Sequence, residues 1–187
     1  MIQWLTILWL PILVSAVGIF VASSVIHMVF KWHMSDYKKF GNEDDVRAAV
    51  RAGNREGGMY VVPSCEPKDM NTPEMQLKLR EGPVGLLLLR KPGVVPGMGT
   101  PLIQWFAFVL ATSAIIGYIA YKAILTPDTF GQVARLTGGL AFLTYGAGSI
   151  QFGIWYGKPW NTVAKDMLDA VVYAAITGVA FGMLWRP

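Results

Sequence analysis

Long apolar runs separated by short polar segments dominate the chain. The first, residues 4–30, contains no Asp, Glu, Lys or Arg. As a helix rising about 1.5 Å per residue, it is longer than a hydrocarbon layer of about 30 Å. Three later runs, the last extended by the turns before it, complete a pattern that predicts four transmembrane helices over residues 3–30, 101–124, 132–156 and 162–185.

The connections between the last three predicted helices are short and contain helix-breaking residues. Residues 126–128 read Thr-Pro-Asp, and residues 157–159 read Gly-Lys-Pro. Short connections of this kind join antiparallel neighbours. We therefore expect an all-α integral membrane protein in which residues 1–187 form a single membrane domain built on a four-transmembrane-helix bundle.

Residues 31–100 separate the first two predicted helices and are too long to be a simple loop. Two short helices are indicated: one capped by Asn42 and ended by Gly53, the other capped by Thr72 and ended by Gly82. The segment predicts an ordered cap insert of short helices, too small for a catalytic domain with its own core.

Two apolar stretches of the insert fall outside these helices. Residues 58–63 are expected to be briefly extended. Residues 85–89 are too few to span a membrane, so we expect them to lie at the interface or under the bundle.

Composition agrees with a membrane protein. Hydrophobic residues make up 53% of the chain and charged residues only 15%, with a mean hydropathy of +0.43, whereas soluble domains carry about 25% charged residues. Four spans would place 13 of the 16 Lys and Arg residues on the side of the insert. This bias predicts that residues 31–100 lie in the cytoplasm and that both termini lie outside.

The formal charge of +4 does not indicate nucleic-acid binding, because the basic residues of the predicted cytoplasmic side are nearly balanced by acidic ones. The lipid bilayer is the partner the pattern implies. Three lysines that follow the first span are predicted to contact lipid headgroups: Lys31, Lys38 and Lys39.

Polar residues recur near the cytoplasmic ends of the predicted spans and are candidates for a polar vestibule: His27, Gln104, Gln151, Asp166 and Asp169. Asp166 and Asp169 share one helix face, although acids near a helix start need no functional explanation. A pairing of Asp169 with His27 across the bundle is the strongest reason to expect a site there.

Metal-binding candidates are weak in the sequence. His27 and His33 lie about 240° apart on a continuous helix, so they cannot bind one metal ion without a break between them. Interfacial hydrogen bonding is the plain alternative. Cys65, near Met70 and Met75, lacks a specific ligand spacing. No cofactor is predicted, although haem and a metal ion are not excluded.

Small residues line faces of the last two predicted helices, and small faces let helix backbones approach closely in lipid. Whether they pack within the chain or between copies is left open by the sequence. The candidate packing positions are Gly153, Gly157, Ala170, Ala174, Gly178 and Gly182.

Four segments carry a resemblance to known sequences: residues 23–28, 31–37, 81–83 and 157–160. Through them the whole chain resembles a group of small bacterial inner-membrane proteins with four spans and no established activity. The resemblance implies the four-span fold and a location in the bacterial inner (plasma) membrane, and no site residues are carried over from it.

The leading hypothesis for function is a non-enzymatic membrane protein that acts through helix packing, as a homo-oligomer or as an accessory subunit of a larger membrane complex. Signatures of the common nucleotide-binding, hydrolase and metalloprotease classes are absent from the sequence. The alternatives are a small transporter or channel with a polar cytoplasmic vestibule, and a membrane-embedded haem or metal protein.

Overall fold

The structure is a computed structural model that describes residues 3–53, 56–93, 97–124 and 129–185. The chain forms two compact units. The membrane unit comprises residues 1–37 and 97–187, and the insert unit comprises residues 38–96. Each unit is described by itself.

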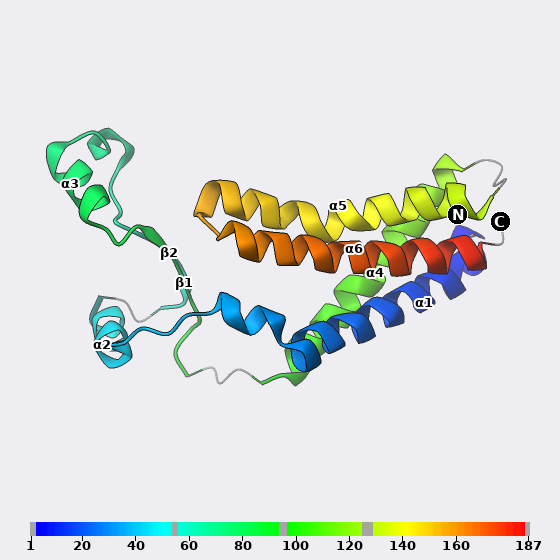
Figure 1. The fold of residues 1–187 in the computed structure, drawn as a ribbon, viewed down its shortest axis with the longest axis horizontal. Helices are drawn as coiled ribbons and strands as arrows, with labels where there is room; N and C mark the ends of the chain where they lie inside the picture. The colour runs from blue at the N-terminus through cyan, green and yellow to red at the C-terminus, as the bar shows by residue number, and fades with distance from the viewer. Residues whose placement is uncertain (1–2, 54–55, 94–96, 125–128, 186–187) are drawn as a thin grey trace. The chain divides into compact units, whose positions relative to one another are not determined.

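The membrane unit is built from four long helices (Figure 1). They are α1 (Gln3–Ser24), which continues as the π-helix η1 (Val25–Phe30), α4 (Gly99–Ala123), α5 (Phe130–Tyr156) and α6 (Trp160–Leu184). Within the part of the chain that the structure describes, three segments are long and apolar enough to cross a membrane: Gln3–Phe30, Gly99–Ala123 and Trp160–Leu184. Their length and composition indicate a membrane-embedded protein. α5 covers the remaining predicted span, but its many glycines and its polar residues lower its hydropathy.

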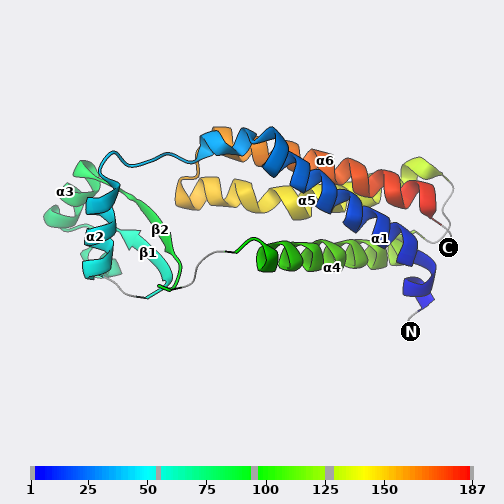
Figure 2. The same cartoon turned by 90° about the horizontal axis from the view of Figure 1, so that it is seen from below.

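The four helices alternate in direction, and their buried faces form two apolar clusters. One cluster joins the start of α1 to the end of α6, where Leu8 and Phe181 are fully buried. The second lies nearer the other end of the bundle and includes Ile19, Val109 and Tyr173. Figures 1 and 2 show α5 beside α6 along its length, and α1 packs against both α4 and α6.

The predicted turn between α5 and α6 is present and has a physical cause. Gly157 caps α5 in the left-handed conformation, with φ 69°, and the Lys158 amide donates to the Phe152 carbonyl at 3.3 Å. This arrangement satisfies carbonyls at the helix end. The turn predicted at residues 126–128 lies outside the described residues.

The small-residue face of α6 packs against α5 of the same chain. A Cβ atom at Gly178 would lie 2.8 Å from the Ala134 carbonyl oxygen, and one at Gly138 would lie 3.0 Å from the Ala174 carbonyl oxygen. Among the other candidate packing positions, Ala170 is fully buried, Gly182 lies against Phe130, and Gly153 lies against Val163. Gly157 does not pack in this way, because it caps the end of α5 and no heavy atom lies within 4 Å of a Cβ built there. Gly138, Gly153, Gly178 and Gly182 thus serve close packing between α5 and α6.

A chain of buried hydroxyls joins three helices near the middle of the bundle. Ser113 of α4 donates to Ser15 of α1 at 3.3 Å, and Ser15 donates to Thr177 of α6 at 3.1 Å. Thr177 in turn donates to the Tyr173 carbonyl at 2.9 Å. Hydrogen bonds between membrane helices typically contribute about 0.6 kcal/mol each and have a fixed geometry.

The insert unit contains both predicted helices, as α2 (Glu43–Gly53) and α3 (Pro73–Glu81), together with the short 3-10 helix η3 (Pro67–Asp69). Thr72 caps α3 by accepting from the Met75 amide at 3.4 Å. Lys38 and Lys39 precede α2 and are exposed.

The insert also contains a two-stranded antiparallel sheet, so its description as short helices alone is incomplete. Strand β1 (Gly58–Val62) pairs with β2 (Gly85–Leu89), and Tyr60 lies opposite Leu87. The apolar run at residues 85–89 is therefore a strand that pairs along one edge with residues 58–62 of the stretch predicted to be extended.

Candidate metal centre

The helix geometry changes at the end of the first span, where η1 gives way to a second short helix. Lys31 adopts a left-handed conformation with φ 52°, and the 3-10 helix η2 (Trp32–Asp36) follows it. The separation of about 240° expected for His27 and His33 holds only for a continuous helix. With this break, their rings stack in parallel, with centroids 4.8 Å apart and planes 7° from each other.

Asp169 of α6 faces these two rings. Its Oδ2 atom lies 3.0 Å from the His33 Nε2 atom and 3.8 Å from the His27 Nε2 atom. The residue is only 5% exposed, whereas the His27 side chain is 51% exposed. We call these three residues the His–His–Asp cluster. The carboxylate predicted to pair with His27 thus lies nearer to His33.

The second ring nitrogen of each histidine also has an acceptor. His27 Nδ1 lies 3.0 Å from the Ser23 carbonyl oxygen, and His33 Nδ1 lies 2.9 Å from Asp36 Oδ2. Assigning the Nδ1 proton as the donor to each acceptor leaves both Nε2 atoms with their lone pairs. Metal-binding histidines are commonly oriented by a carbonyl or a carboxylate in this way.

Lys165 of α6 fixes η2 to the bundle. Its Nζ atom donates to Asp36 Oδ1 at 2.5 Å, to Ser35 Oγ at 2.8 Å and to the Trp32 carbonyl at 2.9 Å. The hydrogen bond from Lys165 holds the pKa of the Asp36 carboxyl below its ordinary value, and the bond from His33 lowers it further. Asp36 therefore stays ionised and keeps its acceptor for His33.

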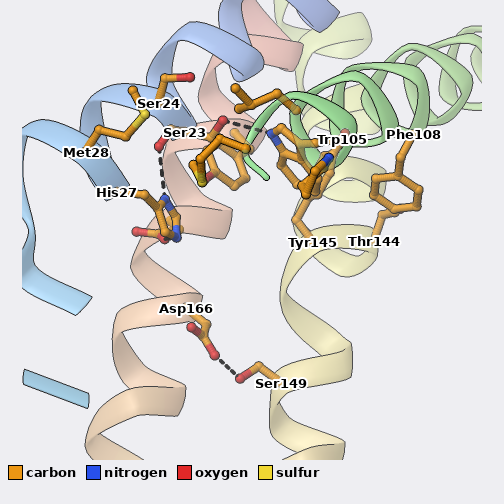
Figure 3. Close-up of a pocket in the computed structure, with 15 residues that line it drawn as sticks. Ser23, Ser24, His27, Met28, Trp105, Phe108, Thr144, Tyr145, Ser149 and Asp166 are labelled. Carbon is orange, nitrogen blue, oxygen red and sulfur yellow. Dashed lines mark hydrogen bonds and ion pairs between the residues drawn. The ribbon is translucent and has the colours of Figure 1, made fainter. Parts of the chain in front are cut away.

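Asp166, one helical turn before Asp169, has different partners. Its Oδ2 atom accepts from Ser149 Oγ and forms an ion pair with Lys158 Nζ. Figure 3 shows the Asp166–Ser149 bond between α6 and α5. The charge of Asp166 is thus compensated by Lys158, whereas the ion-pair partners of Asp169 among the described residues are the imidazole rings of His27 and His33.

The His–His–Asp cluster has the donor set of a transition-metal site. The three ligand atoms lie within 4.8 Å of one another, and the ligand atoms of a tetrahedral zinc ion lie about 3.3 Å apart. Asp169 Oδ1 is buried and has no hydrogen-bond partner among the described residues. Two Nε2 lone pairs facing a carboxylate repel it unless a cation, either a proton or a metal ion, lies between them.

Haem does not fit the same residues. Axial ligands approach haem iron from opposite faces of the macrocycle. The stacked rings of His27 and His33 point their Nε2 atoms toward one carboxylate instead.

The other candidate residues do not join the cluster. Gln104 and Gln151 are exposed and lie outside the pocket at this end of the bundle. Cys65 is a free thiol of the insert unit. Lys31 contributes its backbone conformation at the break.

Two residues of the site were missed by the sequence analysis. Asp36 follows His33 by three positions, a spacing that itself suggests contact within a helical turn. Ser23 contributes a backbone oxygen, for which the sequence offers no signal.

Comparison with known protein families, with curated proteins and with solved structures found no match to this chain. The function is therefore argued from the site itself.

Proposed function

We propose that the protein is a four-span integral membrane protein that binds one divalent transition-metal ion at the His–His–Asp cluster. The observation that carries the proposal is the convergence of two imidazole Nε2 atoms on a buried carboxylate, 3.0 and 3.8 Å from its Oδ2 atom. Both imidazoles are held through their other nitrogen, as ligands of a functional metal site usually are.

The ligand types favour Zn²⁺ or Fe²⁺. Imidazole and carboxylate suit borderline first-row ions, and two histidines with one carboxylate occur in catalytic sites of both metals. Three protein ligands leave at least one position for water or substrate. The half-exposed ring of His27 leaves this side of the cluster accessible.

We further propose that α5 is the fourth span. It is 27 residues long, and its glycines lie against α6, which is apolar enough to cross the membrane. Four spans and the positive-inside rule orient the insert and the metal site toward the cytoplasm of a bacterial cell.

The competing functions have less support. The small face of α6 packs against α5 of the same chain, so it gives no separate reason for self-association or for an accessory role. For a channel, the fully buried Phe181 and its apolar neighbours oppose a polar path from the site to the far end of the bundle.

The metal proposal is tested with the purified full-length protein, stripped with a chelator and titrated with Co²⁺ as a spectroscopic substitute for Zn²⁺. We expect one Co²⁺ per chain, with visible absorption bands of a low-symmetry nitrogen and oxygen site. His33→Ala removes one ligand and should abolish the bands. If the wild type binds neither Co²⁺ nor Zn²⁺, the cluster is an imidazolium–carboxylate ion pair and the proposal is wrong.

The orientation is tested at Cys65, the only cysteine in the chain. In intact cells, we expect a membrane-permeant maleimide to modify Cys65 and an impermeant maleimide to leave it unmodified, because the insert is proposed to face the cytoplasm. Permeabilised cells provide the control, in which both reagents should react. Labelling of intact cells by the impermeant reagent would reverse the proposed topology.

A further inference from the structure

A pocket of about 540 Å³ adjoins the His–His–Asp cluster in the membrane unit. It lies between the end of the first span and helices α4, α5 and α6, and its volume is within the range of small-molecule sites. His27 and Asp169 belong both to the cluster and to the wall of this pocket. A molecule in the pocket would therefore reach the metal position directly.

The two sides of the pocket differ in character. Figure 3 shows His27 and Asp166 on one side, with Trp105 and Phe108 of α4 across from them. The α4 side is aromatic and is extended by Tyr145, whose ring centroid lies 6.2 Å from that of Trp105 and 6.3 Å from that of Phe108. The lining is thus apolar along one side and polar at the cluster.

The indole N–H of Trp105 is already used in a hydrogen bond within the protein. Its Nε1 atom donates to Ser23 Oγ at 2.9 Å, so the indole presents its apolar surface to the pocket. Met28, Met98 and Leu102 add further apolar surface. A wall of this kind suits a hydrocarbon chain and offers few partners to a sugar or a nucleotide.

Exposed apolar side chains line part of the pocket. Met28 and Phe108 are exposed on helices long and apolar enough to cross a membrane, and Met98 is exposed directly before the start of α4. A ligand that enters between them comes from the bilayer.

The net charge of the metal centre at the polar end of the pocket determines which kind of ligand headgroup would bind there. A divalent ion held by one carboxylate and two neutral imidazoles has one net positive charge. Lys158 already compensates the charge of Asp166. An anionic oxygen donor on the ligand would neutralise the centre and fill an open coordination position.

We infer that the pocket binds a single-chain lipid with a carboxylate head, a long-chain fatty acid, whose chain lies along α4 and whose carboxylate meets the metal ion. The assignment of the carboxylate contact rests on the proposed metal site. The assignment of the hydrocarbon chain rests separately on the apolar wall of the pocket.

The test measures binding of radiolabelled palmitate to the full-length protein loaded with Zn²⁺. Leu102→Trp and Thr144→Phe introduce bulk into the pocket from two different helices, and each should weaken palmitate binding at least tenfold. Ile103→Trp is the matched control, because Ile103 is 73% exposed and does not line the pocket. It should change the affinity less than twofold, and all three variants should still bind one Co²⁺ per chain, which shows that they are folded.

Competition separates the roles of head and chain. Hexadecanol and hexadecyltrimethylammonium should compete with palmitate at least tenfold more weakly than unlabelled palmitate does, and removal of Zn²⁺ should abolish this preference. Normal Co²⁺ binding with no palmitate binding, or with palmitate binding unaffected by both pocket variants, would overturn the inference and leave the metal proposal intact. Palmitate binding that is sensitive to the pocket variants in a protein that binds no metal would overturn the metal proposal and the assigned headgroup contact.

Discussion

Asp169→Asn is expected to weaken Co²⁺ binding more than 100-fold, because the amide keeps the shape of the side chain and removes the only anionic ligand of the cluster. The carboxylate is 5% exposed and faces two imidazole Nε2 atoms. Its charge is therefore poorly screened by water and dominates attraction of a cation at this point. The measurement is a Co²⁺ titration followed by visible absorption and checked by metal analysis.

Asp166→Asn is the matched control, since Asp166 lies one turn away on the same helix and is paired with Lys158. We expect it to change Co²⁺ affinity less than threefold. Equal losses in the two variants would mean that general acidity of this end of α6 attracts the metal, in contradiction to a defined ligand set.

Gly178→Leu is expected to destabilise the bundle by about 3 kcal/mol, because even the first carbon of the new side chain would meet the Ala134 carbonyl oxygen at 2.8 Å. The neighbouring atom is backbone and cannot rotate away. For a chain of this size, such a loss lowers Tm by about 6–12 °C. Thermal unfolding in mild detergent, followed by circular dichroism, measures the change.

Gly139→Leu controls for the general effect of leucine at a glycine position in these helices. Gly139 is exposed, and no heavy atom lies within 4 Å of a Cβ built there. Its variant should unfold within about 2 °C of the wild type. A Gly178→Leu protein as stable as this control would mean that α5 and α6 do not pack as closely as described.

The long helices could be predicted from the uninterrupted apolar runs. In lipid, the backbone N–H and C=O groups of such a run have no water to bind, so they must hydrogen-bond to one another, as they do in a helix. The ends of α3 and α5 could also be predicted, since Thr72 and Gly157 act through local geometry. The pairing of β1 with β2 could not be, because residues 85–89 are apolar without the alternation that marks a strand, and their partner lies more than 20 residues earlier.

Within the candidate site, some residues could be predicted from the sequence and others could not. The depth of His27 and Asp169 could be predicted from helix rise, and the two side chains do lie near each other. The position of His33 could not, because it depends on the left-handed backbone of Lys31, which its sequence context does not specify. Gln104 and Gln151 match the depth of the site but lie on exposed faces, since depth alone does not determine the direction in which a side chain points.

The hydrogen bonds that link Ser15, Ser113 and Thr177 fix how far α1, α4 and α6 are shifted along one another. Apolar surfaces in lipid discriminate weakly between helix registers, whereas a hydrogen bond is lost when one helix slides along another. A slip of one turn moves a residue by about 5.4 Å, more than the 3.0 Å that joins His33 to Asp169. Hydroxyls at the centre of the membrane unit thus set the depth at which two distant parts of the sequence meet, and a register error there would separate the ligands without altering any of them.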